Sequence, residues 1–474
     1  MARLADTLRW RDFSGGNIQK VSSDIKIPNS VPFSLNLLFD KVLGEAVSRE
    51  GTNIIGSQLS AGNACLGLFQ HLDSTPANNV LLAGFNAVLY NVLSGATLAS
   101  SLGTNRMHFA TFLNTTLILN GSSPRSYSSS GLVSTGGNLD VGNVPSGAKF
   151  PIEFKDRMYA AVTDRLHYTT APVSPTAGTV SWTGAGSGSL QVEQEDGGGT
   201  MQGLNKVPGY LMIYKQRSLK RWNFDSSFPE DLINIGTQSH ESVIRARGKN
   251  YFFYGPNGFY ETNGGYPRLI SRPIQRVVEG IASSFYSSIN GWSDNENVYW
   301  SVGTVTMNFD RGFTESYSNV VLRFNIDMEQ WAPLQYYHSF RALSQYISGD
   351  DVLLAGGDAD GQVLQLNTGN SDYNGNAIKY LLQSPEFDFE RREVRKTISD
   401  RIYAHSDGTV GATLQVRLDY GQWISIGSLK DIVTEVPIKA LTAYIFEFRI
   451  VDSITGEQIK LRGLDFPNID VLSN

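Results

Sequence analysis

Residues 248–265 have the sequence Gly248-Lys-Asn-Tyr-Phe-Phe-Tyr-Gly-Pro-Asn-Gly-Phe-Tyr-Glu-Thr-Asn-Gly-Gly265. Four β-forming residues at 251–254 precede a Gly-Pro-Asn-Gly turn, and residues 259–262 form a second run of the same kind. Asn and Gly accept the positive φ that a tight reversal demands, so the segment predicts a β-hairpin.

Six further segments share this layout of strand, polar turn and strand. They are residues 79–90, 115–127, 156–168, 209–222 and 351–366, and the pair 297–302 and 319–325, whose strands are separated by a long insertion. Such units return about every 30 to 50 residues, a period typical of repeat architectures. About seven units fall within the ~4 to 8 blades that β-propellers use. We therefore predict an all-β fold with a β-propeller of about six to seven blades.

The chain divides into three parts. Residues 1–63 lack a strong periodicity and predict an extended, irregular N-terminal arm, whereas residues 64–372 hold the propeller repeats. Residues 373–474 contain strands of alternating pattern, which suit a compact C-terminal β-sandwich. Those strands are expected at 378–383, 402–405, 412–420, 423–426 and 444–451. Helix is expected mainly near residues 274–282, and the absence of strand–helix alternation argues against a doubly wound nucleotide-binding fold.

Composition narrows the classes of protein that the chain can belong to. No apolar run approaches the ~20 residues of a membrane-spanning helix, and residues 1–10 lack the apolar stretch of a signal peptide. We therefore expect a soluble protein, made in the cytoplasm, without membrane insertion. The single cysteine, Cys65, excludes an internal disulfide framework and a Cys-based zinc site. A net charge of −6 argues against a protein whose overall positive charge would bind nucleic acid electrostatically.

A search for catalytic and binding motifs is negative. The glycine-rich stretches at 184–188 and 197–199 lack the Lys-Ser/Thr of a phosphate loop and predict surface loops. The histidines show no close ligand spacing, and we expect strand or turn residues at His71, His108, His167, His240, His338 and His405. The sequence thus predicts no catalytic residue, no cofactor or cofactor-binding residue and no metal site.

Two acidic clusters have a structural interpretation. Asp358-Ala-Asp-Gly361 has alternate carboxylates and a glycine, as at the start of a calcium loop, but the bidentate Glu that such a loop needs downstream is missing. We predict a hairpin turn with local hydrogen bonds there, and a solvated turn at Asp294-Asn-Glu-Asn297. The sialidase-type turn Ser-x-Asp-x-Gly-x-Thr-Trp does not recur, and no acid and partner stand out for glycoside hydrolysis. We expect that the protein is not an enzyme.

Two basic runs leave alternatives open. They are Glu390-Arg-Arg-Glu-Val-Arg-Lys396 and Lys215-Gln-Arg-Ser-Leu-Lys-Arg221. Either could contact DNA phosphates or pair with an acidic neighbour in an oligomer. The plainer interpretation is a solvated strand edge, where Lys and Arg discourage unwanted sheet pairing.

Both ends of the chain resemble one family. The N-terminal segments Phe13-Ser-Gly-Gly-Asn17, Ile27-Pro-Asn-Ser-Val-Pro-Phe-Ser-Leu-Asn36 and Gly44-Glu-Ala-Val-Ser-Arg-Glu-Gly51 resemble the opening of tail nozzle and hub proteins of short-tailed bacteriophages. In that family a Gly-Gly turn, a proline-containing loop, an Asn and an Arg followed shortly by Gly lead into a β-propeller. At the other end, Ser384-Pro-Glu-Phe-Asp-Phe389, Val394-Arg-Lys396 and Leu414-Gln-Val-Arg-Leu-Asp-Tyr-Gly421 look like the β-sandwich that follows it. The large insertions of some nozzle proteins are absent here.

The resemblance implies a mechanical role. Such proteins form a homo-oligomeric ring, commonly a hexamer, below the portal and adaptor, and surround the channel that retains packaged DNA until ejection. Expected partners are the tail adaptor, portal-side and other tail proteins, with transient, non-specific contact with phage DNA. The expected location is the virion tail, assembled in the host cytoplasm. Gly15, Gly16 and Arg49 are expected to be structural elements of the arm.

A second class of function remains open from the sequence. A receptor- or glycan-binding propeller, as in an adhesin or a tail-associated glycosidase, would use exposed aromatic side chains as a platform. Trp222, Tyr254, Tyr260 and Trp300 are the residues for that role. Alternating aromatic residues on strands more often pack between blades, which is the competing interpretation.

Overall fold

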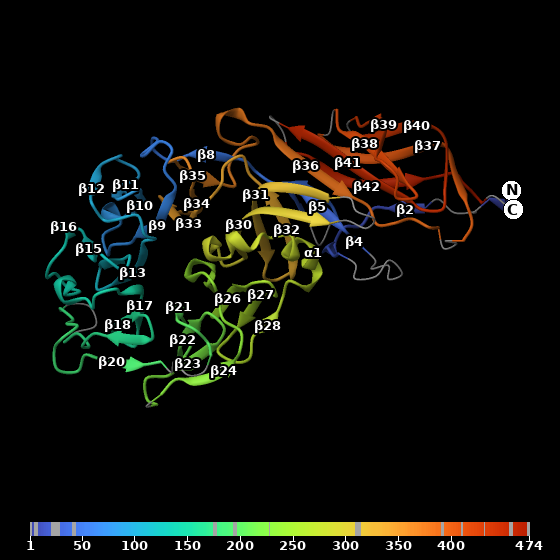
Figure 1. Ribbon diagram of the computed structural model, residues 1–474. Helices are drawn as coiled ribbons and strands as arrows, with labels where there is room; N and C mark the ends of the chain where they lie inside the picture. Colours follow the sequence, from blue (N-terminus) through green and yellow to red (C-terminus); the bar gives the residue numbers. More distant parts are fainter. Residues whose placement is uncertain are drawn as a thin grey trace.

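The computed structural model describes residues 2–3, 8–19, 29–39, 44–173, 178–192, 197–226, 228–308, 314–389, 393–408, 411–430, 432–454 and 458–471. Within them the regular structure is almost entirely strand (Figure 1). The described helices are short: η1 (Pro76–Asn78), η2 (Val141–Asn143), η3 (His240–Ser242), η4 (Arg272–Ile274), α1 (Gln275–Glu279), η5 (Ser283–Ser288) and η7 (Tyr373–Gly375). The predicted all-β class and the predicted position of the helix are confirmed. Among the described residues, no helix has the length and apolar character to cross a membrane.

Seven antiparallel four-stranded sheets follow one another along the chain. We call them the seven-sheet body. The first sheet has β9 (Cys65–His71), β10 (Val80–Phe85), β11 (Val88–Asn91) and β12 (Thr97–Ala99), the second has β13 (His108–Phe112), β14 (Thr115–Leu119), β15 (Arg125–Ser128) and β16 (Gly131–Val133), and the third has β17 (Lys149–Phe154), β18 (Arg157–Val162), β19 (Arg165–Tyr168) and β20 (Gly188–Gln191). The fourth has β21 (Met201–Val207), β22 (Tyr210–Lys215), β23 (Leu219–Trp222) and β24 (Glu230–Ile233), and the fifth has β25 (Ile244–Ala246), β26 (Lys249–Tyr254), β27 (Gly258–Thr262) and β28 (Arg268–Leu269). The sixth has β29 (Asn290–Ser293), β30 (Asn297–Asn308), β31 (Thr314–Asn325) and β32 (Gln330–Gln335), and the seventh has β33 (Ala342–Ser348), β34 (Asp351–Gly357), β35 (Val363–Leu366) and β8 (Thr52–Ile54).

Each predicted hairpin is the middle pair of strands of one sheet. The hairpin at 248–265 is β26 and β27, paired from Asn250 opposite Thr262 to Tyr254 opposite Gly258. The other six predicted units fall in the same way on the second and third strands of the remaining sheets. These central strands are buried on both faces, so their apolar and aromatic runs are the strongest in the chain.

The sheets form a closed circuit of contacts. The first strand of each sheet contacts the first strand of the next, and β33 of the seventh sheet contacts β9 of the first. In Figure 1 the sheets follow one another from blue through green to orange, so that the last lies beside the first. Every sheet therefore packs between two neighbours.

Aromatic side chains fill the layers between sheets. Trp300 of β30 is fully buried, 4.6 Å from the ring of Phe259 in the fifth sheet. Trp222 of β23 lies 6.0 Å from Tyr159 of the third sheet in an edge-to-face arrangement. Such pairs add to the ~25 cal/mol per Å² gained by burying apolar area. The packing interpretation of the aromatic residues is thus confirmed.

Residues 1–63 contribute separate short strands to the sheets of the rest of the chain. Strand β8 closes the seventh sheet, with Thr52 opposite Leu366 and Ile54 opposite Leu364. The expected irregular arm is therefore not a separate unit in the described parts of residues 1–63. Strands of two or three residues are too short to show a detectable period in the sequence.

Two further sheets hold the C-terminal strands. One has the order β39 (Ile424–Ser428), β38 (Thr413–Leu418), β41 (Phe446–Ile454), β36 (Ile378–Gln383), β5 (Phe33–Leu35). The other has the order β1 (Ala2–Arg3), β43 (Ile469–Val471), β37 (Lys396–Asp407), β42 (Lys460–Phe466), β7 (Ala46–Ser48), β6 (Leu37–Phe39), with β2 (Leu8–Trp10) on β42 and β40 (Ile432–Ala443) on β37. A small parallel pair, β3 (Gly16–Asn17) and β4 (Ser30–Val31), completes the strands. All five strands expected in this part of the chain are present.

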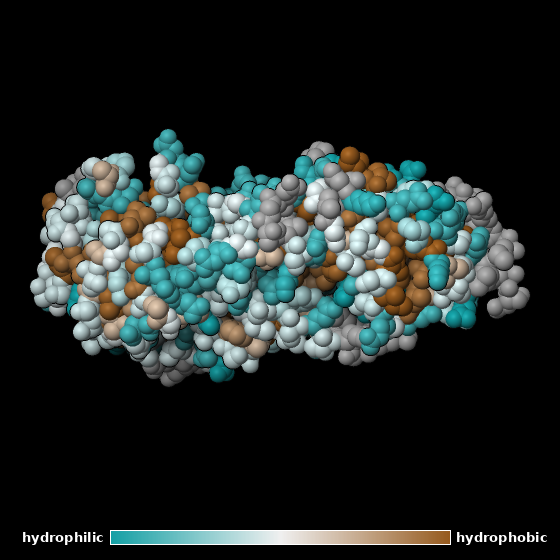
Figure 2. Space-filling view, turned by 90° about the horizontal axis from the view of Figure 1, so that it is seen from above, coloured by the Kyte–Doolittle hydropathy of each residue, from teal (hydrophilic) through white to brown (hydrophobic). Residues whose placement is uncertain are grey.

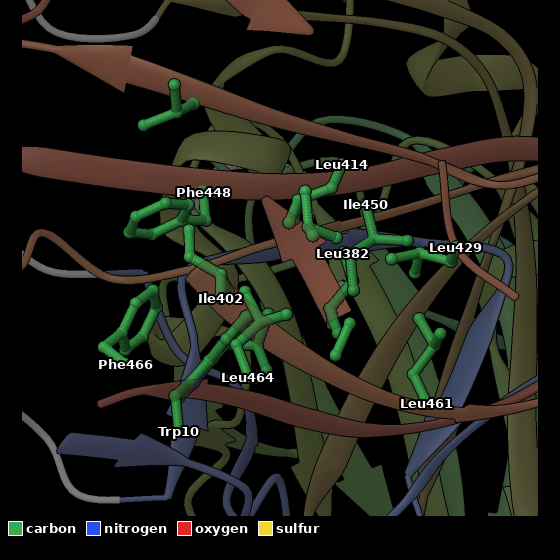
Figure 3. Close-up of a cluster of buried hydrophobic side chains, with 14 of the residues drawn as sticks. Trp10, Leu382, Ile402, Leu414, Leu429, Phe448, Ile450, Leu461, Leu464 and Phe466 are labelled. Atoms are coloured by element: carbon green, nitrogen blue, oxygen red, sulfur yellow. The ribbon is translucent and has the colours of Figure 1, made fainter. Parts of the chain in front are cut away.

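The two C-terminal sheets share one hydrophobic core (Figure 3). Ile402 and Leu464 come from the sheet of β37, and Leu414 and Ile450 from the sheet of β38. Trp10 from the N-terminal segment packs into the same core. We call these two sheets with their N-terminal strands the C-terminal body.

The insertion seen in the sixth repeat lengthens the hairpin β30–β31. Each of its strands has 12 residues, and the hairpin reaches the C-terminal body (Figure 1). There Arg449 of β41 lies 3.1 Å from Glu315, and Tyr317 packs against Phe33 at 5.4 Å between ring centroids. The hairpin therefore joins the two bodies by side-chain contacts.

A glycine pair tests how tightly β8 is anchored. Gly361 has φ +82°, and a Cβ there would lie 1.9 Å from the backbone oxygen of Ser60, in the segment that follows β8. Gly349 has φ +64° with nothing within 4 Å of its Cβ position. Gly349→Ala should cost only about 1–2 kcal/mol of strain. Gly361→Ala should cost a further ~1–3 kcal/mol, because the backbone must also move apart.

Urea unfolding of both variants measures this difference. Equal losses of unfolding free energy would show that the Ser60 segment yields freely, contrary to a tightly anchored β8.

Candidate site in the central cavity

A cavity of about 380 Å³ lies among the first strands of the seven-sheet body. Its walls come from β9, β13, η3, β29 and β33 and from residues just before β13. The lining includes Phe69, Met107, Trp292 and Gln345, so most of the wall is neutral. We call it the central cavity.

Four ionisable side chains meet on one side of this cavity. His108 begins β13, Arg106 precedes it, and His240 and Glu241 belong to η3. His108 Nδ1 lies 2.6 Å from Glu241 Oε1, and Arg106 lies 3.4 Å from the other carboxylate oxygen. The rings of His108 and His240 stand at 79° to each other, with centroids 5.2 Å apart. We call these four residues the cavity cluster.

Hydrogen bonds within the fold hold η3 in place. Ser239 Oγ donates to the carbonyl of Ile289 at 2.6 Å, and Thr237 Oγ1 donates to the carbonyl of Phe253 at 2.9 Å. Arg106 donates to the carbonyls of Ser288 and Arg341, at 3.2 and 2.9 Å. The cluster is therefore assembled from several sheets by buried polar contacts.

The electrostatics of the cluster favour an ionised carboxylate beside a neutral imidazole. Burial opposes ionisation of Glu241, but the charges of His108 and Arg106 outweigh it and hold its pKa well below the usual range. Burial lowers the pKa of His240 to about 4. At neutral pH, His240 is neutral and Glu241 carries its negative charge.

The turn at Asp358 has the local hydrogen bonds predicted for it. The fully buried Asp358 accepts from the backbone N–H groups of Asp360 and Gln362, at 2.9 and 2.8 Å. Its second oxygen lies 2.8 Å from His338 Nδ1. Asp294 behaves similarly, accepting from the backbone of Glu296 at 2.9 Å. Both acidic clusters thus contribute to turns.

Arg49 lies in a buried polar junction. Its guanidinium donates to both carboxylate oxygens of Asp372, at 2.9 and 2.7 Å, and its Nε donates to Asn36 Oδ1 at 2.9 Å. It also donates to the carbonyl of Gln335 at 2.6 Å and stacks 4.0 Å from the ring centroid of Tyr336. Only 1% of its side chain is exposed. These contacts support the structural role expected for Arg49.

The expected glycines pack near the sixth sheet. Gly16 belongs to β3 and lies against the side chain of Gln330 in β32. Gly15 donates its N–H to the carbonyl of Asn29 at 2.7 Å. Ile27 and Pro28, in the proline-containing loop of the resemblance, lie outside the described residues.

The aromatic platform suggested for glycan binding is not on the surface. Trp222, Tyr260 and Trp300 are buried, and Tyr254 is only partly exposed. The interpretation of these residues as an exposed platform is therefore wrong, because their rings pack between sheets.

The basic run at 215–221 does not form a solvated edge or a DNA-facing patch. Lys215 and Lys220 are buried, and Lys220 lies 2.5 Å from Asp231. Arg221 pairs with Glu230 at 2.8 Å. In the second run, residues 390–392 lie outside the described part of the chain, and Lys396 is buried.

The reactivity of Cys65 tests whether the contact between the first and seventh sheets is closed to solvent. Its side chain is buried beside the position where Gly357 of the seventh sheet would carry a Cβ, and burial raises the pKa of the thiol to about 12. Because the thiolate is the reactive form, we expect a thiol reagent to label Cys65 slowly in native buffer and rapidly in urea. Immediate labelling of the native protein would contradict a closed contact between the first and seventh sheets.

The cavity cluster is the feature that sequence reasoning missed. His108 and His240 are far apart in the chain, and each stands alone among strand and turn residues. The only local signal is the adjacent pair His240-Glu241, which is too short to indicate a site. The structure also leaves His71, His167 and His405 outside the cluster.

No model of a known protein family matches the chain, and neither does any curated protein sequence.

Proposed function

We propose that this chain is a structural protein of a bacteriophage tail, of the nozzle or hub type. Copies of it would form a closed ring around the DNA channel, retain packaged DNA in the head and pass it at ejection. The proposal starts from the resemblance of both chain ends to that family and includes no enzymatic step. Its partners would be the adaptor, portal-side and other tail proteins of the virion.

The observation that carries the proposal is the closed circuit of seven sheets. A seven-bladed β-propeller accounts for the order of the sheets, for the contacts between their first strands and for the closure of the seventh sheet by β8. Two C-terminal sheets packed over one core account for the β-sandwich of the family. Such a body has short, protected edges and resists deformation, as a conduit under internal pressure requires.

The dimensions of the central cavity indicate where the DNA would run. A volume of about 380 Å³ is in the range of small-molecule pockets, ~300–1,000 Å³, and is too small for a duplex. The DNA channel would therefore lie between copies of the chain and not within one copy. A net charge of −6 suits a wall past which DNA must slide, since strong phosphate binding would retard it.

Exposed apolar side chains on the C-terminal body supply a surface for self-association. Figure 2 shows hydrophobic side chains on both halves of the upper face, including the half that holds the C-terminal strands. On the neighbouring strands β39 and β40, Ile424, Ile432 and Val433 are 49%, 64% and 50% exposed. Exposed apolar groups of this kind mark association surfaces, and closed symmetric rings are the usual outcome of repeated contacts.

Electron microscopy of the purified protein, alone and with its neighbouring tail proteins, tests the proposal. We expect closed rings that stack coaxially on the connector. A chain that stays monomeric with every tail partner present, or one that hydrolyses a glycan at a carboxylate pair, would overturn it.

The surface on β39 and β40 makes a specific prediction. The double variant Ile424→Glu/Val433→Glu should abolish ring formation, because charges in an apolar contact are not compensated. Tyr266→Glu, at a residue 78% exposed beside β28 of the seven-sheet body, is the control and should leave rings intact. Analytical ultracentrifugation measures both. Rings formed equally well by the double variant would show that the contact lies elsewhere.

A further inference from the structure

The cavity cluster has the donor set of a transition-metal site. One nitrogen from each of His108 and His240 and one oxygen of Glu241 lie within 4.8 Å of one another. Two imidazoles and a carboxylate are ligands that Zn²⁺ accepts in sites with three protein ligands and an open fourth position. All three residues line the central cavity.

A second observation concerns the way these groups face one another. His108 is only 6% exposed, and its Nδ1 faces Glu241 Oε1 at 2.6 Å. His240 Nδ1 is buried without a hydrogen-bond partner among the described residues. Buried polar atoms normally find such partners, so groups of this kind indicate an absent ion or water.

We propose that His108, His240 and Glu241 bind one divalent transition-metal ion, with Zn²⁺ as the best fit, at the wall of the central cavity. Ligands of a tetrahedral Zn²⁺ stand ~3.3 Å apart, given metal–ligand distances of ~2.0–2.1 Å. His108 and Glu241 must therefore separate by several tenths of an ångström when the ion enters. A water molecule in the cavity completes the coordination.

Arg106 is the positioning residue of this site. It lies 3.4 Å from Glu241 Oε2, so Oε1, which faces the proposed ligand His108, is the carboxylate oxygen that would bind the metal. Arg106 also donates hydrogen bonds to the carbonyls of Ser288 and Arg341, and these bonds hold its guanidinium in place. Charged partners that orient a ligating carboxylate are a regular part of metal sites.

The ion cross-links parts of the fold that are distant in sequence. His108 belongs to the second sheet, and η3 lies between the fourth and fifth sheets. Binding therefore bridges the cavity wall and stabilises the closed circuit. This inference rests on the geometry of the cluster and not on the proposed tail function.

A second cluster, His338 with Asp358 and Asp360, provides the matched control. There Asp358 Oδ1 accepts two backbone N–H groups, which fix the carboxylate in its turn, and Asp360 is exposed. We therefore expect no tight metal binding at that cluster.

The first experiment uses the full-length chain after treatment with a chelator. Titration with ZnCl₂ in a calorimeter should give one ion per chain, and X-ray absorption of the zinc-loaded protein should show two imidazoles and oxygen ligands. Stoichiometry well below one, or a coordination sphere without imidazole, overturns the proposal without recourse to any variant.

The second experiment locates the ion. Glu241→Gln and His240→Asn should weaken Zn²⁺ binding by at least ~100-fold, whereas His338→Asn should leave it unchanged. Loss of binding in His338→Asn with retention in Glu241→Gln places the ion elsewhere and overturns the assignment. Arg106→Met should weaken binding ~10–100-fold at unchanged stoichiometry, with partial rescue by Arg106→Lys, as expected of a residue outside the coordination sphere.

Discussion

Replacing Arg49 with methionine should lower the free energy of unfolding by about 3–5 kcal/mol, since it leaves a buried carboxylate without its partner. Asp372 is 3% exposed and accepts its two shortest hydrogen bonds from the guanidinium. The same substitution removes the donors to Asn36 and to the carbonyl of Gln335. Urea unfolding followed by tryptophan fluorescence measures the loss.

Two variants make this measurement decisive. Arg247→Met breaks an ion pair with Asp327 in which both side chains are exposed, and it should leave the unfolding midpoint almost unchanged. Adding Asp372→Asn to Arg49→Met should recover part of the loss, because the uncompensated charge is gone. If Arg49→Met and Arg247→Met have equal effects, the junction does not hold the N-terminal segment to the sheets.

Removal of residues 1–63 should prevent the rest of the chain from folding to a soluble monomer. The seventh sheet would lose β8 and expose the edge of β35, and the C-terminal body would lose β5 from β36 and β2 and β7 from β42. Unpaired edges of this kind invite association between chains. The soluble fraction on expression and size-exclusion chromatography are the measurements.

Supplying the missing segment separately is the control for this truncation. Co-expression of residues 1–63 with residues 64–474 should restore soluble protein, because strands that pair through backbone hydrogen bonds need no covalent link. A truncated chain that is soluble, monomeric and as stable as the full chain would refute the interlocking of the N-terminal strands.

Both predictions concern the rigidity on which the proposed role depends. The segment at 44–54 contributes β7 to the C-terminal body, Arg49 to the buried junction and β8 to the seventh sheet. One short stretch thus ties both bodies together. A conduit that retains DNA needs such ties, because its two parts must not separate under load.

The sequence alone determined the repeated hairpins and the all-β class. Within each unit, strand-forming residues and a polar turn are neighbours in the chain, and central strands buried on both faces must be apolar whatever surrounds them. For the same reason the C-terminal strands and the helix near residue 275 could be located. The local turns at Asp294 and Asp358 also followed from residues a few positions apart.

Only the tertiary structure decided which distant residues meet. Closure of the seventh sheet by β8, the pairing of Arg49 with Asp372 and the meeting of His108 with His240 and Glu241 each join segments separated by more than a hundred residues. No local pattern records such contacts, because the strands and side chains involved are individually ordinary. Their positions follow from the order in which the sheets pack around the cavity, which the pattern of single hairpins does not contain.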